Sequence, residues 1–327
     1  MEILILGAGV SGLTTGICLL EAGHRARMWA AELPPATTSN VAAAVWYPYR
    51  AWPIERVAAW GAATYEAFEG LCGGAESGVI QREVIELMPR VTPEDPWWRA
   101  GVRGFRRLRE DERAPGYPDG WSFQAPVIDT TVYLDYLVGR FTALGGQIER
   151  RHVADLTEPL AACDVVINCT GLGARDLLGD TAVHPARGQV VSIPATGFGR
   201  VLLDDHGPNA VAYIVPRVHD IILGGTDSDD DDRLTADPSD TRSILSRCAS
   251  IVEHLDAAFA AHLRALATGD PTALTVKVGL RPVRETVRLE REEVAPGKLV
   301  VHNYGHGGAG ITLSWGCARE AAALATS

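Results

Sequence analysis

Two glycine-rich runs, one near each end of the chain, have the residue pattern best suited to binding a ligand through the backbone. The first is Gly7-Ala8-Gly9-Val10-Ser11-Gly12, and the second lies within HNYGHGGAGITLSWGCA at 302–318. Each run follows a short apolar segment and opens into a helix-like one, so bare amide and carbonyl groups come close to a bound molecule. Two such runs at opposite ends of one sequence predict one long cofactor held by both.

The first run matches the pattern G-x-G-x-x-G between a strand and a helix. Its glycines allow a tight turn, close approach to a pyrophosphate and close helix–strand packing, so it predicts dinucleotide binding without separating FAD from NAD. The pattern expects an acid about 20 residues later on the adenosine ribose. Glu32 stands 20 residues after Gly12 and is either that partner or a surface glutamate.

An arginine and a tyrosine in strand-like segments could bind a carboxylate. Arg281 lies in VGLRPVR, where the following proline favours an extended backbone. Its planar fork suits a carboxylate ligand, although a structural salt bridge explains it equally well. Tyr213 lies in the alternating segment AYIVP and could be a ligand or a core residue.

Small polar residues followed by alanines form the segment TTSNVAAAVWYPY at 37–49. Hydroxyl groups and exposed backbone of this kind can contact a cofactor. The same residues can cap the start of a helix, and both interpretations can hold together.

A βαβ beginning and a second unit of the same type should position these residues. Apolar runs and glycine stops predict strands at 2–6 and 24–30 around a helix at 11–22. Later, they predict a helix at 131–144, strands at 147–150, 164–171, 189–193, 212–216 and 221–224, and mainly helix at 239–266. The cofactor domain is therefore expected to be discontinuous and interrupted twice by a strand-rich domain.

Composition bounds the function classes. The chain has 327 residues, 46% hydrophobic content and a net charge of −11. Because of this negative charge, nucleic acid and anionic membrane surfaces are not expected as partners. No apolar stretch is long enough for a membrane span, and no signal peptide is expected. Six cysteines without a close pair are interpreted as reduced thiols in a cytoplasmic protein, with one disulfide left open. No Cys/His cluster has metal-ligand spacing, and the run 227–232 is interpreted as a solvated loop.

Taken together, GAGVSG, TTSNVAAAVWYPY, DVVINCTGLGA, RGQ, AYIVP, GLRPVRETVRLERE and HNYGHGGAGITLSWGCA resemble the D-amino-acid oxidase family in order and spacing, from residue 2 to about 323. The resemblance implies an α/β fold with a discontinuous Rossmann-type FAD-binding domain and a strand-rich α+β substrate domain. The expected FAD-binding domain is 1–52, 129–187 and 282–327, and the expected substrate-binding domain is 53–128 and 188–281. Non-covalent FAD and a homodimer are also implied.

The resemblance assigns roles to individual residues. Arg281 and Tyr213 are expected to hold the substrate carboxylate, and the carbonyl of Gly308 to accept from the substrate amine. Tyr47 and Asn209 are expected in the substrate pocket. Ser11 and Gly12 of the first run and Glu32 are expected at the cofactor as well. The positions that match cofactor contacts of the family are Gly7, Ala8, Gly9, Val10, Thr38, Ser39, Ala43, Ala44, Val45, Val153, Thr170, Gly307, Gly308, Ala309, Gly310, Ile311 and Thr312.

Three positions depart from the family pattern. Asn209, in a short loop at 204–211, stands where mammalian members carry a further substrate tyrosine, and Tyr47 stands where they carry glutamine. Asp227 stands where aspartate-preferring members carry an arginine. An aspartate there would repel an acidic side chain, so neutral or apolar D-amino acids are expected as substrates.

The expected reaction converts a D-amino acid, dioxygen and water to a 2-oxo acid, ammonia and hydrogen peroxide, with hydride transfer to the flavin. No side-chain base is needed, so His302 and His306 are interpreted as structural or flavin-adjacent residues. D-aspartate oxidase and glycine oxidase are alternatives within the family. An NAD-type dehydrogenase and a cofactor-binding protein without activity are the alternatives outside it.

Overall fold

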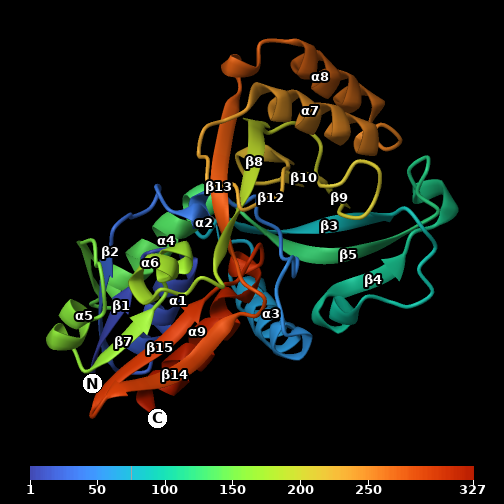
Figure 1. The fold of residues 1–327 in the computed structure, drawn as a ribbon. Coiled ribbons are helices and arrows are strands. Elements are labelled where there is room, and N and C mark those ends of the chain that lie inside the picture. The colour runs from blue at the N-terminus through green and yellow to red at the C-terminus, as the bar shows by residue number, and fades with distance from the viewer. Residues whose placement is uncertain (75) are drawn as a thin grey trace.

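Two β-sheets with helices around them build the computed structural model, which describes residues 1–74 and 76–327 (Figure 1). The first sheet has the strand order β14-β15-β7-β1-β2-β6, and all neighbours pair in parallel except β14 with β15. Its strands are β1 (Glu2–Leu6), β2 (Arg25–Ala30), β6 (Gln147–Arg150), β7 (Val165–Asn168), β14 (Arg288–Ala295) and β15 (Lys298–Tyr304).

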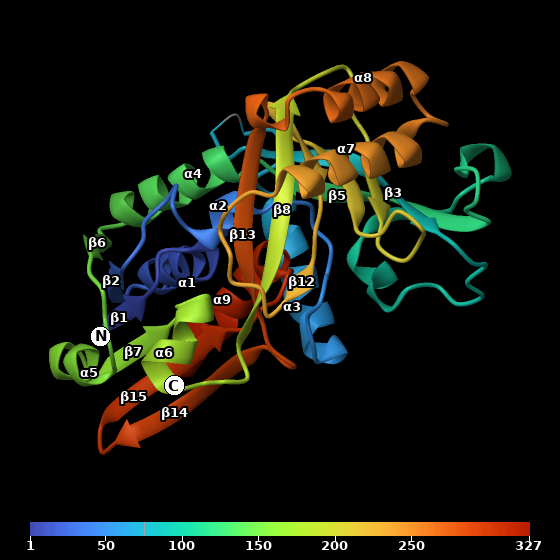
Figure 2. The same cartoon turned by 45° about the horizontal axis from the view of Figure 1, so that its top comes forward.

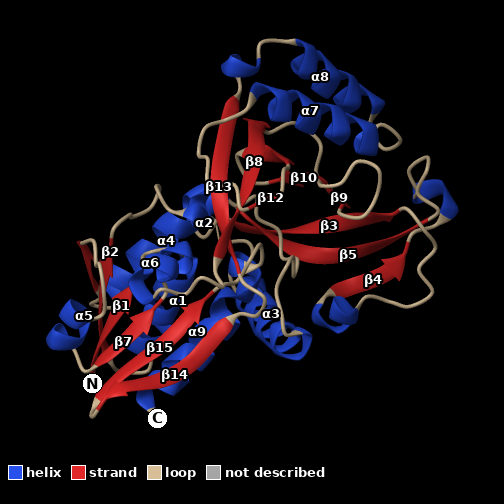
Figure 3. Ribbon diagram, viewed as in Figure 1, coloured by secondary structure: helices blue, strands red, loops and turns tan. Residues whose placement is uncertain are grey.

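The second sheet has the order β12-β8-β11-β10-β9-β3-β5-β4, and β13 also pairs with β8. Figure 3 shows it standing beside the first sheet, with two helices over its far side. Its strands are β3 (Val79–Met88), β4 (Arg103–Arg107), β5 (Asp119–Ile128), β8 (His184–Pro194), β9 (Val201–Asp204), β10 (Ala212–Pro216), β11 (Asp220–Gly224), β12 (Ser228–Asp229) and β13 (Thr275–Val283).

The helices cover both sheets and meet one another closely. A Cβ on Gly316 of α9 would lie 2.3 Å from the backbone oxygen of Trp60 in α3, so glycine allows these two helices to cross. The α-helices are α1 (Val10–Glu21), α2 (Thr38–Val41), α3 (Ile54–Glu69), α4 (Thr130–Ala143), α5 (Thr157–Ala162), α6 (Ala174–Leu178), α7 (Pro238–Val252), α8 (Ala257–Thr268) and α9 (Gly310–Thr326). The short 3-10 helices are η1 (Trp97–Gly101), η2 (Glu110–Glu112), η3 (Gly171–Gly173) and η4 (Pro271–Ala273).

The expected βαβ beginning is confirmed. The apolar run in β1 is buried, as in a central parallel strand, and Gly23 ends the first helix with a φ of 85° that favours glycine. Two further predictions hold and gain detail. The segment 164–171 is a strand that ends at Asn168 in a turn, and the mainly helical segment 239–266 consists of two helices because Asp256 caps the second by accepting from the N–H of Phe259.

The strands β8 and β13 join the two halves of the molecule. They pair along the whole length of β13, from Thr275 with Ser192 to Val283 with His184, and Figure 2 shows both running from the second sheet toward the first. The domain boundaries expected at 187/188 and 281/282 fall inside these strands. The exact division into domains therefore stays a prediction.

Arg217, between β10 and β11, ties the second sheet to the start of α4. Its guanidinium donates to both carboxyl oxygens of Asp220 at 2.6 and 2.7 Å and to the hydroxyl of Thr130 at 2.9 Å. Only 1% of its side chain is exposed. Burial would raise the pKa of Asp220, but hydrogen bonds from Arg217 and Ser192 outweigh it and hold this pKa below its usual value. Arg217 therefore binds an ionised carboxylate in the interior.

Replacing Arg217 by methionine is expected to lower the free energy of unfolding at pH 7 by about 3 kcal/mol, because a buried carboxylate loses its partner. Because the pKa of Asp220 is lowered in the fold, its contribution is present at neutral pH and is lost as the pH falls through that pKa, below about 4. The difference in free energy of unfolding between the variant and wild type should therefore become smaller in acid. Urea unfolding of both proteins at neutral and acidic pH measures this difference. The exposed Arg264, paired with Glu253, provides a control whose methionine variant should lose less than about 1 kcal/mol.

The cysteines are free thiols, all six of them. Burial raises the pKa of Cys169 and Cys248 to about 12, which keeps both protonated and unreactive at neutral pH. Across residues 1–74 and 76–327, no helix combines the length and apolar character needed to cross a membrane. Within the same residues, no three His, Cys, Asp or Glu side chains are grouped as a metal site.

Candidate cofactor and substrate site

A cavity of about 570 Å³ lies between the first sheet and one face of the second. Both glycine-rich runs line it, and so do Tyr47, Tyr213 and Arg281. Its size is within the range of small-molecule sites, and it lies past the carboxyl ends of β1 and β7, where open α/β sheets bind ligands. The structure thus brings the two runs and the predicted carboxylate-binding residues to one site.

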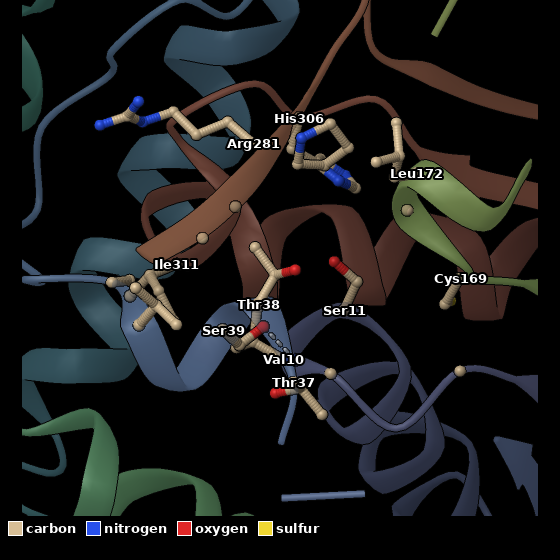
Figure 4. A pocket seen from close by; sticks show the side chains of 18 of the residues that line it. Val10, Ser11, Thr37, Thr38, Ser39, Cys169, Leu172, Arg281, His306 and Ile311 are labelled. Carbon is tan, nitrogen blue, oxygen red and sulfur yellow. Dashed lines mark hydrogen bonds between the residues drawn. The ribbon is translucent and has the colours of Figure 1, made fainter. Parts of the chain in front are cut away.

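The loop after β1 is shaped for a phosphate group. Gly7 has a φ of 103°, and a Cβ on Gly12 would lie 1.9 Å from the backbone oxygen of Gly7. The N–H of Val10 donates to the hydroxyl of Ser39 at 3.0 Å, the dashed line in Figure 4. The N-cap residue Gly9 has no side chain to cap α1, so the positive N-terminal end of this helix faces the cavity. This cradle fits the pyrophosphate of a dinucleotide.

Most of the positions predicted to contact the cofactor line the cavity. Gly12 and Ala309 do not, because Gly12 packs on the loop itself and Ala309 is buried at the start of α9. The predicted positions that line it are Gly7, Ala8, Gly9, Val10, Ser11, Glu32, Thr38, Ser39, Ala43, Ala44, Val45, Val153, Thr170, Gly307, Gly308, Gly310, Ile311 and Thr312.

Glu32 lies at the rim of the cavity just past β2. Its side chain is 57% exposed and forms an ion pair with Arg150 at 3.2 Å. Both sequence interpretations are compatible with this position, so its role on the ribose stays a prediction.

The glycines at 307 and 308 let the chain pass close to other backbone. A Cβ on Gly307 would lie 2.1 Å from the backbone oxygen of Arg50, and one on Gly308 would lie 2.4 Å from the ring of Tyr49.

Nearby, His306 is buried and its Nε2 lies 3.0 Å from the side-chain oxygen of Asn303. Burial lowers the pKa of His306 to about 4, so this ring is neutral at physiological pH.

Arg281 of β13 lies at the end of the cavity away from the first glycine-rich run. Figure 4 shows its guanidinium directed away from Ser11 and His306. Its Nη1 donates to the backbone oxygen of Thr226 at 3.1 Å and to Asp227 at 3.2 Å. The guanidinium lies over Gly188 of β8, where a Cβ would be 2.6 Å from Nη1. The arginine is thus held in place by its neighbours while it lines the cavity.

Asp227 corrects the interpretation of 227–232 as a solvated loop. Its carboxylate accepts from the hydroxyl of Tyr49 at 2.6 Å, from Arg50 at 2.8 Å and from Arg281 at 3.2 Å, and its side chain is only 12% exposed. Asp232, farther along, is exposed as expected. Two arginines neutralise Asp227, so this residue is not the free negative charge that the sequence argument assumed.

Tyr213 of β10 lines the same end of the cavity. Its ring packs on the backbone of Gly224, where a Cβ would lie 1.9 Å from the phenol carbon. Burial raises the pKa of Tyr213, which keeps its hydroxyl protonated and able to donate a hydrogen bond. A protonated tyrosine beside Arg281 forms a pair of donors suited to a carboxylate.

Tyr47 is fixed to the beginning of α9. Its N–H donates to the hydroxyl of Thr312 at 3.1 Å, and that hydroxyl donates back to the carbonyl of Tyr47 at 2.9 Å. The phenol of Tyr47 donates to Glu86 at 2.7 Å. Asn209 is placed differently from the expectation, because its amide donates to the hydroxyl of Tyr117 and it does not line the cavity.

A Gly188→Ala substitution is expected to raise KM for the substrate about tenfold while the protein keeps its cofactor, because the new Cβ displaces the guanidinium of Arg281. Steady-state kinetics and the visible spectrum measure the two effects. Gly197→Ala is the matched control, since no atom lies near a Cβ at that position. An unchanged KM in Gly188→Ala would show that Arg281 does not depend on this contact.

Several residues of the site carried no separate sequence signal. Asp205 lines the cavity directly after β9, and Tyr49 and Arg50 reach Asp227 across 178 and 177 positions of sequence. Glu86 reads as an ordinary polar residue of a strand. Only the adjacent acids at 204–205, at the end of an apolar strand, could have suggested a site there.

Comparison with known proteins agrees with this arrangement. Residues 2–324 match the family model described as FAD dependent oxidoreductase. The chain is 47% identical over 322 residues to the D-amino-acid oxidase of Rubrobacter xylanophilus, which covers 98% of this chain and 95% of that protein. It is 35% identical over 338 residues to the D-aspartate oxidase of Homo sapiens, with 99% and 94% covered. The crystal structure of glycine oxidase from Geobacillus kaustophilus shares the fold, with a TM-score of 0.77, 18% identity, and 99% and 94% covered. The chain belongs to the FAD dependent oxidoreductase family.

Proposed function

We propose that this FAD-dependent oxidoreductase catalyses the oxidative deamination of D-amino acids. One D-amino acid, one dioxygen and one water give a 2-oxo acid, ammonia and hydrogen peroxide. The observation that carries the proposal is the placement of Arg281 and Tyr213 together at one end of the cavity whose other end is the dinucleotide loop. The relative named D-amino-acid oxidase, at 47% identity over nearly the whole chain, supports it.

The residues of the chain supply orientation. Arg281 and the protonated Tyr213 bind the substrate carboxylate, and the carbonyl of Gly308 accepts from the amine, so that the Cα–H has one fixed direction. The α9 helix begins at Gly310 without a side-chain cap, and its positive end would stabilise negative charge on the cofactor. The chemistry that non-covalently bound FAD would supply is acceptance of the hydride and reoxidation by dioxygen.

The alternatives differ in substrate or cofactor. An NAD-type dehydrogenase is set aside because the matching family depends on FAD. D-aspartate and glycine oxidation belong to relatives of the same fold. The preference for neutral or apolar side chains predicted from the sequence rested on Asp227 as a free charge. Arg50 and Arg281 both bind Asp227, so this residue does not select the side-chain class, and the substrate panel decides it. A homodimer and a cytoplasmic location stay predictions as well.

A panel of D- and L-amino acids with peroxide detection tests the proposed reaction. Purified protein is expected to be yellow and to release peroxide with D-amino acids but not with their L-enantiomers. Glycine and D-aspartate in the same panel decide between the family alternatives. A yellow protein that releases no peroxide with any D-amino acid would contradict the proposal.

A further inference from the structure

Two carboxyl groups that the proposed reaction does not use lie at the substrate end of the cavity. Asp205 follows β9 and lines the cavity. Its neighbour Asp204 is turned to the other side and is fully used, since it accepts from the hydroxyl of Tyr117 and from the N–H groups of Gly207 at 2.6 Å and Asn209 at 3.1 Å. Asp205 makes no hydrogen bond or ion pair to any residue in 1–74 or 76–327. Its carboxyl group is therefore left for a ligand.

Strand register places Glu86 on the same face. Glu86 of β3 pairs with Leu203 of β9, and Leu203 pairs with Tyr213 of β10. Residues directly opposite in paired strands point to the same side of a sheet. Leu203, Tyr213 and Asp205, which follows the end of β9, line the cavity. Glu86 does not line it and lies behind Tyr47, which does line it and donates to Glu86.

Glu86 is incompletely partnered although it is 1% exposed. Its Oε1 accepts from the hydroxyl of Tyr47 at 2.7 Å, whereas Oε2 has no partner among the described residues. A buried carboxyl oxygen without a donor is unfavourable. Burial raises the pKa of Glu86 to about 8 and that of Asp205 to about 7, even though the charge of Arg281 lowers the pKa of Asp205 in part.

The cations of the protein near this end are already committed. Arg281 and Arg50 both bind Asp227, and neither forms an ion pair with Asp205 or Glu86. Leu203, Val211 and Val215 give the same cavity an apolar wall. The site therefore has a carboxylate anchor, an apolar wall and two acids that form no ion pair with either arginine.

We propose that Asp205, supported by the charge of Glu86 behind Tyr47, binds a cationic group at the end of the substrate side chain, so that D-amino acids with basic side chains, such as D-ornithine, D-lysine and D-arginine, are favoured substrates. This inference rests on the proposed oxidation of D-amino acids. The substrate carboxylate binds Arg281, the methylene groups pack on the apolar wall, and the cation supplies the partner that Asp205 lacks. Apolar and acidic side chains bring no positive charge to these acids.

The test compares D-lysine with D-norleucine, whose side chain is the same four-carbon chain without the ammonium group. Wild-type protein is expected to have a kcat/KM for D-lysine about tenfold or more above that for D-norleucine. Asp205→Asn should lower this ratio about tenfold, and Glu86→Gln should lower it in the same direction. Asp232→Asn, an exposed acid outside the cavity, is the control and should leave the ratio unchanged.

The outcomes separate this inference from the proposed function. If wild-type protein oxidises D-norleucine but prefers it to D-lysine, the inference fails and the proposed function stands. The inference also fails, and the proposed function stands, if Asp205→Asn changes kcat/KM for D-lysine and for D-norleucine by the same factor. If Glu86→Gln does not fold, the result for Asp205→Asn alone tests the inference. If yellow protein oxidises neither substrate nor any other D-amino acid, the proposed function itself fails and the inference with it.

Discussion

Replacing Arg281 by leucine is expected to lower kcat/KM for every D-amino acid about a thousandfold while the protein keeps its FAD. The substrate carboxylate would enter a partly apolar end of the cavity with only Tyr213 to donate to it. Asp227 would also lose one of its two arginines and add a repulsive charge to the site. Steady-state kinetics with a D-amino acid, beside the visible spectrum of the same preparation, measure both parts of the expectation.

The second arginine of the same RPVR motif is the matched control. Arg284 binds Asp180 and the backbone of Thr286 and does not line the cavity, so Arg284→Leu should change kcat/KM by less than about threefold. An Arg281→Leu protein with an unchanged KM would refute the assignment of Arg281 to the carboxylate.

A Gly12→Ala variant is expected to bind FAD about a hundredfold more weakly and to be purified largely colourless. A single Cβ at this position would lie 1.9 Å from the backbone oxygen of Gly7, so the phosphate loop must open and α1 must shift. Gly12 does not line the cavity, so the expected loss of FAD affinity comes from the changed shape of the loop. FAD titration followed by flavin fluorescence measures it.

Gly139→Ala is the control for this substitution. Gly139 lies in helix α4, and no atom lies within 4 Å of the position that a Cβ would take there. Alanine also has a higher helix propensity than glycine. It should bind FAD as wild type does. Circular dichroism on both variants separates loss of FAD from loss of the fold, and full FAD content in Gly12→Ala would contradict the role of this loop.

Local signals account for the part of the fold that the sequence predicts well. The apolar run of β1 and the left-handed Gly23 are signals that act over a few residues. The ends of the first strand and helix are therefore predicted to within about two residues. The segment 239–266 is mainly helical as predicted, but its division into two helices depends on one capping side chain, Asp256, and has no periodic signal.

The site depends on pairings that no local pattern contains. Tyr213 and Arg281 come together only because β10 and β13 belong to one sheet, and it was the family resemblance that named both. Asp227 read as one acid in a polar run because its partners, Tyr49 and Arg50, lie in a distant part of the chain. Glu86 joins the site only through the parallel pairing of β3 with β9.

Anaerobic mixing of the purified protein with a D-amino acid and, separately, with its L-enantiomer tests the central claim most directly. The account predicts that the D-enantiomer alone removes the visible flavin absorption, and that admitting air restores it with release of hydrogen peroxide. A colourless protein, or a flavin absorption that both enantiomers leave unchanged, would contradict it.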